Sequence, residues 1–368
     1  MLSRVANCLF WMSRYIERSE NIARIVDVNL QLLLDFRDLD EHRLSEHWLP
    51  IVQATGDEEA FFKVHGKATG HTVTEFLVFQ PDNPNSIVSS ISDARENARM
   101  VRDQITSEFW EELNRLYLFV RSRQARDLWN SSPFDFFQEI KATSLRLQGM
   151  ADATLMRNEG WLFMQLGKYI ERADKTSRIL DVRYQTLPER GVPKTIGQEE
   201  VLEWSAILNS CSAWDAYKSI HGAEVHPKLV AEFLLLSEDF PRSFEVCISQ
   251  FNQSLRKISG VPEGRFSNEA ERLTGRLLAE VQFCTIDEVF EHGLHQYLDD
   301  LQLKLNAIGA AIFTAYFFQS IKTMDEEIFV QQEEQQQQQR FAPMTKPEGQ
   351  NPKSTKAIGP HFPFGIRS

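Results

Sequence analysis

Residues 14–28 of the chain read RYIERSENIARIVDV, and residues 168–182 read KYIERADKTSRILDV. Eight of the fifteen aligned positions are identical. Neither stretch contains glycine or proline, and apolar residues recur every three or four positions, which is the spacing of one face of an α-helix. The sequence therefore predicts that one long, charge-rich amphipathic helix occurs twice.

Other segments recur in the same order. The pairs are WLPIVQATG from Trp48 and WSAILNSCS from Trp204, FLVFQPDNPNSIVSSI from Phe76 and FLLLSEDFPRSFEVCI from Phe233, and SLRLQGMA from Ser144 and KLNAIGAA from Lys304. The offset grows along the chain, as small loop insertions in the second copy would produce. The sequence therefore predicts two diverged copies of one unit.

Helix signals are frequent and strand signals are not. Asn85 or Ser86 stands as an N-cap before an apolar series that runs from Ile87 to Ile105. Glycine and proline are sparse up to Val330, and alternating strand patterns are hard to find. We predict an all-α fold, a helical bundle built from two diverged tandem copies of one helical unit.

The predicted boundaries follow from composition. A first helical unit with its following segment covers residues 1–185, and residues 186–198, with two prolines and two glycines, form a linker. Residues 199–330 complete the second unit, whose first helix begins near residue 155. Residues 331–368 are rich in glutamine and then proline, so we predict a disordered tail.

The charge balance argues against nucleic acid as a partner. The chain has 40 basic and 52 acidic residues, a net charge of −12. Because the residues from Val330 onward carry a net +2, the body before them stands near −14. Such a body repels phosphate backbones.

The spacing of the cysteines and the length of the apolar runs predict a cytoplasmic protein. The four cysteines, Cys8, Cys211, Cys247 and Cys284, have no paired or metal-like spacing, which suits a reducing compartment. No apolar run is long enough to span a bilayer, so we expect no membrane association.

The sequence contains only incomplete matches to common catalytic and cofactor-binding motifs. Gly66 and Lys67 suggest a phosphate loop, but Phe61 stands where that loop requires glycine. Glu291, His292 and His295 lack a second cluster of ligands, so we interpret them as a polar helix face. We predict no metal and no cofactor.

The repeated phrase carries a stripe of charge. Glu17, Glu20, Arg24 and Asp27 share one helix face, and the second copy keeps charged residues at the same positions. These counterparts are Glu171, Asp174, Arg178 and Asp181. Exposed pairs four residues apart would stabilise each helix only slightly. Retention of the pattern fits charges buried between helices, as either a structural ion network or a functional polar cavity.

A second constellation is a ridge of three arginines, Arg95, Arg99 and Arg102, on the second helix. Guanidinium groups in a row could bind carboxylate or phosphate oxygens through their paired donors. The competing interpretation is internal pairing with Glu96 and Asp103.

Three stretches resemble motifs of the bacterial alpha-E domain family: residues 1–29, 82–106 and 160–181. The resemblance covers roughly residues 1–328 and implies a helical protein of unknown biochemical activity. In that family, neighbouring genes typically encode a circularly permuted ATP-grasp protein, and often a transglutaminase-like protein or an Ntn-type hydrolase. The resemblance thus implies a part in making or processing a peptide or amide product.

The resemblance also implies candidate site residues. They are Arg14, Tyr15, Glu17, Arg18, Glu20, Asn21 and Arg24, then Asn85, Ser86, Arg95, Glu96, Asn97 and Arg99, and in the second copy Glu171, Arg172, Asp174 and Arg178.

Two functional hypotheses remain. In the favoured one, the protein is a non-catalytic helical partner that binds an ATP-grasp ligase or its substrate, and the arginine ridge holds an anionic peptide or an acyl-phosphate-like group. In the other, the protein is an enzyme in which Glu17 or Glu171 acts as general base and the arginines clamp charge.

Overall fold

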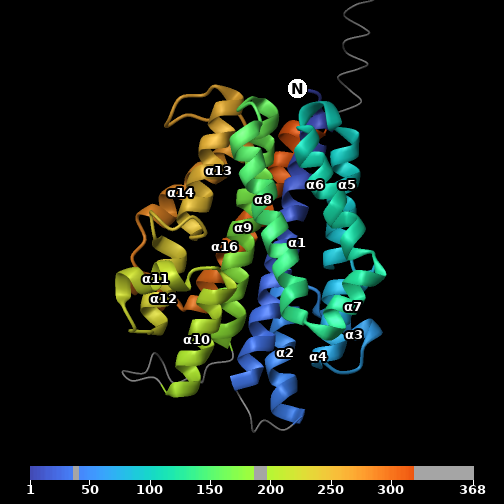
Figure 1. Cartoon of the computed structure of the whole chain (residues 1–368). Coiled ribbons are helices and arrows are strands. Elements are labelled where there is room, and N and C mark those ends of the chain that lie inside the picture. Colours follow the sequence, from blue (N-terminus) through green and yellow to red (C-terminus); the bar gives the residue numbers. More distant parts are fainter. Residues whose placement is uncertain (36–40, 186–196, 319–368) are drawn as a thin grey trace, which may run out of the picture. The chain divides into compact units, whose positions relative to one another are not determined.

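The computed structural model describes residues 1–35, 41–185 and 197–318, and these form one compact unit. Within these ranges every regular element is helical and no strand is present, so the predicted all-α fold is confirmed (Figure 1). None of the described helices is long and apolar enough to cross a membrane.

The predicted long first helix and the predicted helix start at Asn85 or Ser86 are both present. The first helix, α1, runs Ser3–Asp35 without interruption. Helix α5 spans Ile87–Met100, and the side chain of Ser86 accepts a hydrogen bond from the backbone N–H of Ser89 at 3.1 Å. Of the two predicted caps, Ser86 is therefore the one used.

The helices form two successive groups along the chain, one beginning with each long helix. The first half contains α1, α2 (Glu41–Thr55), α3 (Glu58–Val64), α4 (Gly70–Thr74), the π-helical turn η1 (Glu75–Phe79), α5, the 3-10 turn η2 (Arg102–Gln104), α6 (Ser107–Val120), α7 (Arg123–Ser131) and α8 (Pro133–Thr154). The second half contains α9 (Glu159–Gln185), α10 (Gln198–Ser210), α11 (Trp214–His221), α12 (Pro227–Leu236), α13 (Phe244–Ser259), α14 (Glu269–Gln282), α15 (Ile286–His292), α16 (Leu294–Ile312) and the π-helical turn η3 (Phe313–Phe317).

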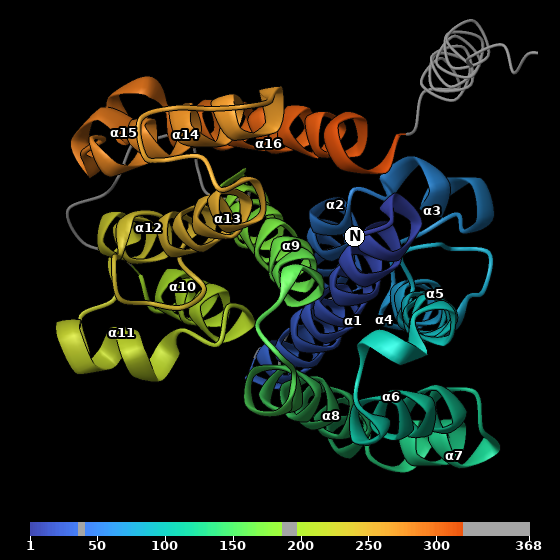
Figure 2. The ribbon, with the colours of Figure 1, turned by 90° about the horizontal axis from the view of Figure 1, so that it is seen from above.

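Helices α1 and α9, which carry the two quoted stretches, lie side by side at the centre (Figure 2). They run parallel, because Met1 pairs with Glu159 and Arg14 pairs with Glu171 further along. Gly167 permits their close approach: a Cβ atom there would lie 2.1 Å from the carbonyl oxygen of Phe10. Any larger residue at position 167 would push the two helices apart.

The surrounding helices pack in the same way in each half. Helices α5 and α8 pack on α1, with α6 against both, and α13 and α16 pack on α9, with α14 against both. Helix α2 also packs on α9, and α10 packs on α1. Each half thus covers part of the other's long helix, and a single apolar core includes residues from both.

Several local features also recur at matching positions. Trp48 and Trp204 are both buried, and Ser243 caps α13 as Ser86 caps α5. Gly56 has a φ of 79°, and its counterpart Ser212 has a φ of 50°, in the left-handed region that few non-glycine residues adopt. The duplication itself stays a prediction.

Of the predicted boundaries, the second unit's first helix begins at Glu159 rather than near residue 155. Residues 186–196 of the predicted linker and the predicted disordered tail, residues 331–368, lie outside the described residues.

Candidate functional site

The predicted stripe of charge on α1 is buried. Glu17, Glu20, Arg24 and Asp27 are each at most 3% exposed, and Glu171 on α9 is fully buried. These side chains come from the uninterrupted faces of two helices that pack against each other. The expectation of buried charges between helices is confirmed for these residues, whereas the side chains of Asp174 and Arg178 in the second copy are 13% and 24% exposed.

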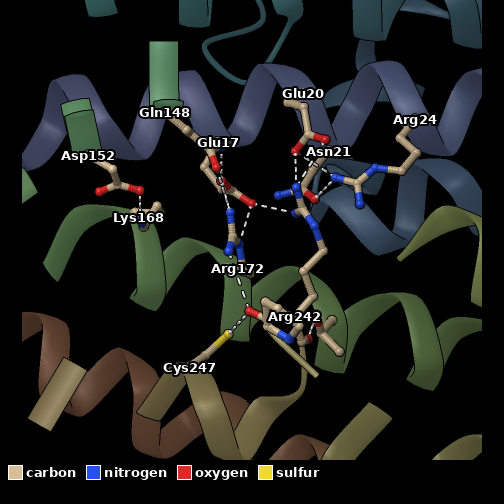
Figure 3. Close-up of polar contacts among 12 residues, drawn as sticks. Glu17, Glu20, Asn21, Arg24, Gln148, Asp152, Lys168, Arg172, Arg242 and Cys247 are labelled. Carbon is tan, nitrogen blue, oxygen red and sulfur yellow. Dashed lines mark hydrogen bonds and ion pairs between the residues drawn. The ribbon is translucent and has the colours of Figure 1, made fainter. Parts of the chain in front are cut away.

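Glu17 lies at the centre of a saturated cluster (Figure 3). Its two carboxylate oxygens accept hydrogen bonds from Arg172 Nε and Nη2, both at 2.9 Å, and from Arg242 Nη1 at 2.7 Å. Gln148 Nε2 donates to it as well, at 2.9 Å. We call Glu17, Glu20, Arg24, Arg172 and Arg242 the closed network, because hydrogen bonds between carboxylates and guanidinium groups connect all five side chains.

The second carboxylate of the closed network is Glu20. It accepts from Arg242 Nη2 at 3.0 Å and from Arg24 Nη2 at 2.7 Å. Burial, together with the charge of Arg242, lowers the pKa of Arg24 to about 10. Among the described residues, Nε and Nη1 of Arg24 have no hydrogen-bond partner.

Glu171 forms the reciprocal cluster. It accepts from Arg14 Nε at 2.8 Å and from Arg18 Nε at 2.7 Å. Arg18 Nη1 donates to Asn85 at 2.8 Å, and Asn85 donates in turn to Asp57 at 2.7 Å. The Glu-Arg pair of each long helix is thus paired with the Glu-Arg pair of the other: Glu17 with Arg172, and Glu171 with Arg18.

The arginines keep both central carboxylates ionised. Burial by itself would raise the pKa of Glu17, but the charges of Arg172 and Arg242 outweigh burial and hold that pKa well below its usual range. For Glu171 burial is likewise outweighed, by Arg18 and Arg14, and its pKa is lowered too. Both carboxylates are therefore weak proton acceptors.

The two clusters differ at one decisive position. In the aligned segments from Phe76 and Phe233, Asn85 matches Arg242. The Arg242 guanidinium lies between the carboxylates of Glu17 and Glu20, whereas Asn85 is too short to lie between their counterparts. There Lys175, the counterpart of Asn21, supplies the cation.

Lys175 compensates the negative charge of Glu171 and Asp174 but does not fill the space between them as the guanidinium of Arg242 does between Glu17 and Glu20. Its Nζ lies 3.2 Å from Asp174 and 4.0 Å from Glu171. An ammonium on a slender stem occupies less volume than a guanidinium. A pocket of about 340 Å³ lies here, which we call the basic pocket.

The basic pocket is lined by residues of both halves. They are Phe10, Trp11, Arg14, Arg18, Thr55, Asn85, Ile170, Asp174, Lys175, Arg178, Leu305, Asn306, Gly309, Phe313 and Phe317. Four cationic side chains thus face one carboxylate in a chain whose net charge is −12. The counterparts of Trp11 and Arg14, Gln165 and Lys168, line a cavity of only about 20 Å³.

Two arginines in the basic pocket have donors to spare. Arg14 uses Nε for Glu171 and stacks over Trp11 at 4.6 Å, and Arg178 uses Nε for Asp174 at 2.9 Å. Among the described residues, neither arginine forms a hydrogen bond through its Nη atoms. Each therefore offers a guanidinium fork suited to a carboxylate or a phosphate.

The predicted site residues thus divide between three places. Arg14, Arg18, Asn85, Asp174 and Arg178 line the basic pocket, with Glu171 beneath them and Tyr15 against Arg18 and Trp11. Glu17, Glu20, Asn21, Arg24 and Arg172 belong to or adjoin the closed network. Ser86 caps α5, and Asn97 bonds the carbonyl of Asp93 within the same helix.

The predicted arginine ridge does not line the basic pocket. Arg95 and Arg99 both pair with Glu96, and Arg95 also donates to Asn114. Arg102 stacks over the Trp110 ring at 4.8 Å. The predicted internal pairing is therefore present for Glu96, whereas Asp103 accepts a hydrogen bond from Gln104 instead of pairing with an arginine of the ridge.

Two residues at the centre of the site were not predicted, Arg242 and Lys175. Both had a signal in the repeats: Arg242 is aligned with Asn85, and Lys175 with Asn21. At each position one copy carries a cation and the other a neutral amide. Reading the differences between the copies, rather than only the identities, would have found them.

The described residues include one cluster with possible metal ligands, Asp181, His295 and Asp299. The two ring nitrogens of His295 face different carboxylates, Nδ1 towards Asp181 at 2.6 Å and Nε2 towards Asp299 at 3.7 Å. A single ion binds only one nitrogen of an imidazole ring. Because the hydrogen bond to Asp181 raises the pKa of His295, the arrangement fits an ion pair.

The fold and the site define an all-α protein in which two parallel central helices exchange buried Glu-Arg pairs beside a basic pocket. The chain belongs to the Alpha-E family, described as a predicted alpha-helical domain with a conserved ER motif, which matches residues 1–317. The Glu-Arg pairs at residues 17–18 and 171–172 fit that description.

Relatives of the chain have no described activity. Uncharacterized proteins of Mycobacterium bovis and Mycobacterium tuberculosis are each 26% identical to it over 322 residues. The alignment covers 83% of this chain, and the chain spans only 35% of the length of each relative. No solved structure matches the chain.

Proposed function

We propose that the protein is a non-catalytic, substrate-handling subunit that holds an anionic ligand in the basic pocket. One observation carries this proposal: Arg14 and Arg178 present guanidinium forks without acceptors to a cavity lined by four cations. Fixed, partly buried guanidinium groups bind oxyanions strongly because little conformational entropy is lost on binding.

The geometry favours binding over catalysis. An enzyme of the alternative kind would need Glu17 or Glu171 as general base, with a pKa raised towards neutrality. Both carboxylates instead have lowered pKa values and are saturated by arginine donors. A carboxylate stabilised as an anion in this way is a poor base.

The wider context of the proposal is an ATP-grasp-linked system that makes or processes a peptide or amide. ATP-grasp ligases act on carboxylates and convert them to acyl phosphates, and both species carry the negative charge that the basic pocket accommodates. The protein would then present such a group to a circularly permuted ATP-grasp partner, with a transglutaminase-like protein or Ntn-type hydrolase acting in the same system. Co-elution of the purified protein with that ligase tests the partnership.

The binding site itself is tested by titration calorimetry with glutamate and with inorganic phosphate at low ionic strength. We expect the wild-type protein to bind at least one of these anions and the Arg14→Gln/Arg178→Gln variant to bind it at least tenfold more weakly. The matched control removes the arginine ridge, as Arg95→Gln/Arg99→Gln/Arg102→Gln, and should bind normally. Loss of binding in the control alone would place the site on the arginine ridge of α5 and η2.

A further inference from the structure

The two free guanidinium forks are held at fixed positions. Arg14 is anchored through Nε to Glu171 at 2.8 Å, and Arg178 is anchored through Nε to Asp174 at 2.9 Å. Glu171 and Asp174 lie on the same face of α9, three residues and therefore about 4.5 Å of helix rise apart. The carboxylates that anchor the two forks are thus less than one helical turn apart along α9, and both forks belong to the lining of one cavity.

A third cation lies between these anchors. Lys175 Nζ is 3.2 Å from Asp174 and 4.0 Å from Glu171, and it is 9% exposed. Arg14, Lys175 and Arg178 therefore form a short row of positive charge within one cavity. Glu171 and Asp174 offset two of the four positive charges of Arg14, Arg18, Lys175 and Arg178, so a single anionic group leaves one positive charge uncompensated.

We propose that the basic pocket selects a compact dianion, whose two carboxylate or phosphate groups are spaced to reach the forks of Arg14 and Arg178 together. This inference rests on the proposed function and adds its substrate class. Glutarate-like diacids, with three carbons between the carboxylates, and pyrophosphate, which carries at least two negative charges near neutral pH, both have two anionic groups joined by a short linker. The closed network shows the complementary arrangement, because there one guanidinium, that of Arg242, spans two carboxylates, Glu17 and Glu20.

The basic pocket has an aromatic side next to Arg14 and a polar side elsewhere. Phe10, Trp11, Phe313 and Phe317 gather beside Arg14, whereas Thr55 and Asn306 supply the polar lining elsewhere. An anion bound at Arg14 therefore lies against aromatic rings, which reduce its hydration and strengthen the ion pair. Longer ligands would extend past these rings.

The test is titration calorimetry of the full chain with a series of anions: butyrate, malonate, succinate, glutarate, adipate and pyrophosphate. We expect one diacid of intermediate length, or pyrophosphate, to bind at least tenfold more tightly than butyrate. A preference for glutarate would identify dicarboxylates, and a preference for pyrophosphate would identify phosphates.

Single substitutions measure the contribution of each of the two arginines to binding. Arg14→Gln and Arg178→Gln should each reduce the affinity of the preferred dianion to that of butyrate, and Arg14→Lys, which keeps the charge but not the fork, should lie between. Arg99→Gln serves as the exposed control and should leave every affinity unchanged. Circular dichroism checks that each variant is folded.

Two outcomes would overturn the inference in distinguishable ways. Equal affinity for butyrate and for all dianions would refute selection of a dianion while leaving anion binding intact. Absence of binding to any of the anions, by folded wild-type protein, would refute the proposed function as well.

Discussion

Glu17 and Glu171 stand at the same place in the same repeated phrase, yet their surroundings differ. The donors to Glu17, Arg172 and Arg242, are both at most 10% exposed. The donors to Glu171, Arg14 and Arg18, are 18% and 13% exposed and border the basic pocket. Removing one partner of an ion pair lowers the free energy of unfolding most where the remaining charge is buried and cannot be hydrated.

We expect Glu17→Gln to lower the free energy of unfolding by about 3 to 5 kcal/mol, because it strands two buried arginines. Glu171→Gln should cost less, about 1 to 3 kcal/mol, because Arg14 and Arg18 can turn towards the basic pocket. It should also weaken anion binding, since Arg14 loses its anchor. Urea unfolding and calorimetry of both variants measure these effects, and equal stability losses with unchanged binding would contradict this account.

The lowered pKa values predict a dependence of stability on pH. Because the folded-state pKa of Glu17 and of Glu171 lies below the unfolded value, each contributes stability that is present above about pH 4.3 and is lost as pH falls through the folded-state pKa. We expect the free energy of unfolding to fall steeply below about pH 4.5. Glu17→Gln should flatten this slope, and Glu263→Gln, an exposed control, should not. A slope unaffected by Glu17→Gln would show that Glu17 keeps an ordinary pKa when folded.

At the scale of elements, the close contact of α1 and α9 depends on Gly167. Its backbone lies so near Phe10 that a Cβ atom would overlap the carbonyl oxygen. Gly149, on the exposed side of α8, has no neighbour within 4 Å of the corresponding position. These two helical glycines make a matched pair.

We expect Gly167→Ala to destabilise the protein by about 3 kcal/mol or more, because the two central helices must separate and their ion pairs lengthen. Gly149→Ala should be neutral or stabilise by up to about 1 kcal/mol through helix propensity. Thermal melts of both variants provide the comparison. A Gly167→Ala variant as stable as Gly149→Ala would mean that α1 and α9 do not pack this closely.

The sequence predicted those features that depend only on residues close together along the chain. Apolar periodicity predicted α1, Ser86 was one of two predicted caps, and the pairs Glu20 with Arg24 and Asp174 with Arg178 follow from helix spacing. The reciprocal pairs between α1 and α9 could not be predicted, because spacing along one helix does not reveal which helix lies opposite. For the same reason the sequence did not show that Arg95 and Arg99 of the arginine ridge pair with Glu96, or that Arg14 and Arg178 line one pocket.

At the scale of the whole described unit, the two halves depend on each other. Their central helices exchange ion pairs, and α2 and α10 each pack on the long helix of the other half. Neither half can therefore bury its own long helix. The fold is better understood as one cooperative unit than as two adjoining domains.

We expect urea unfolding to show a single transition reported equally by both halves. Single-tryptophan variants that retain Trp129 or Trp204 place a fluorescent probe in each half. Coincident midpoints are expected, because loss of one half exposes the other's central helix. Two separated transitions would show that the halves fold independently.

The central claim is that the basic pocket is open because Asn85 and Lys175 stand where the closed network has Arg242 and Asn21. Asn85→Arg/Lys175→Asn should place a guanidinium between Glu171 and Asp174 and fill the pocket while preserving its charge. The decisive measurement is the affinity of this variant, by titration calorimetry, for the anion that the wild-type protein binds best. We predict at least a tenfold loss of affinity with a melting temperature within a few degrees of wild type. Wild-type affinity in the folded variant would contradict the account.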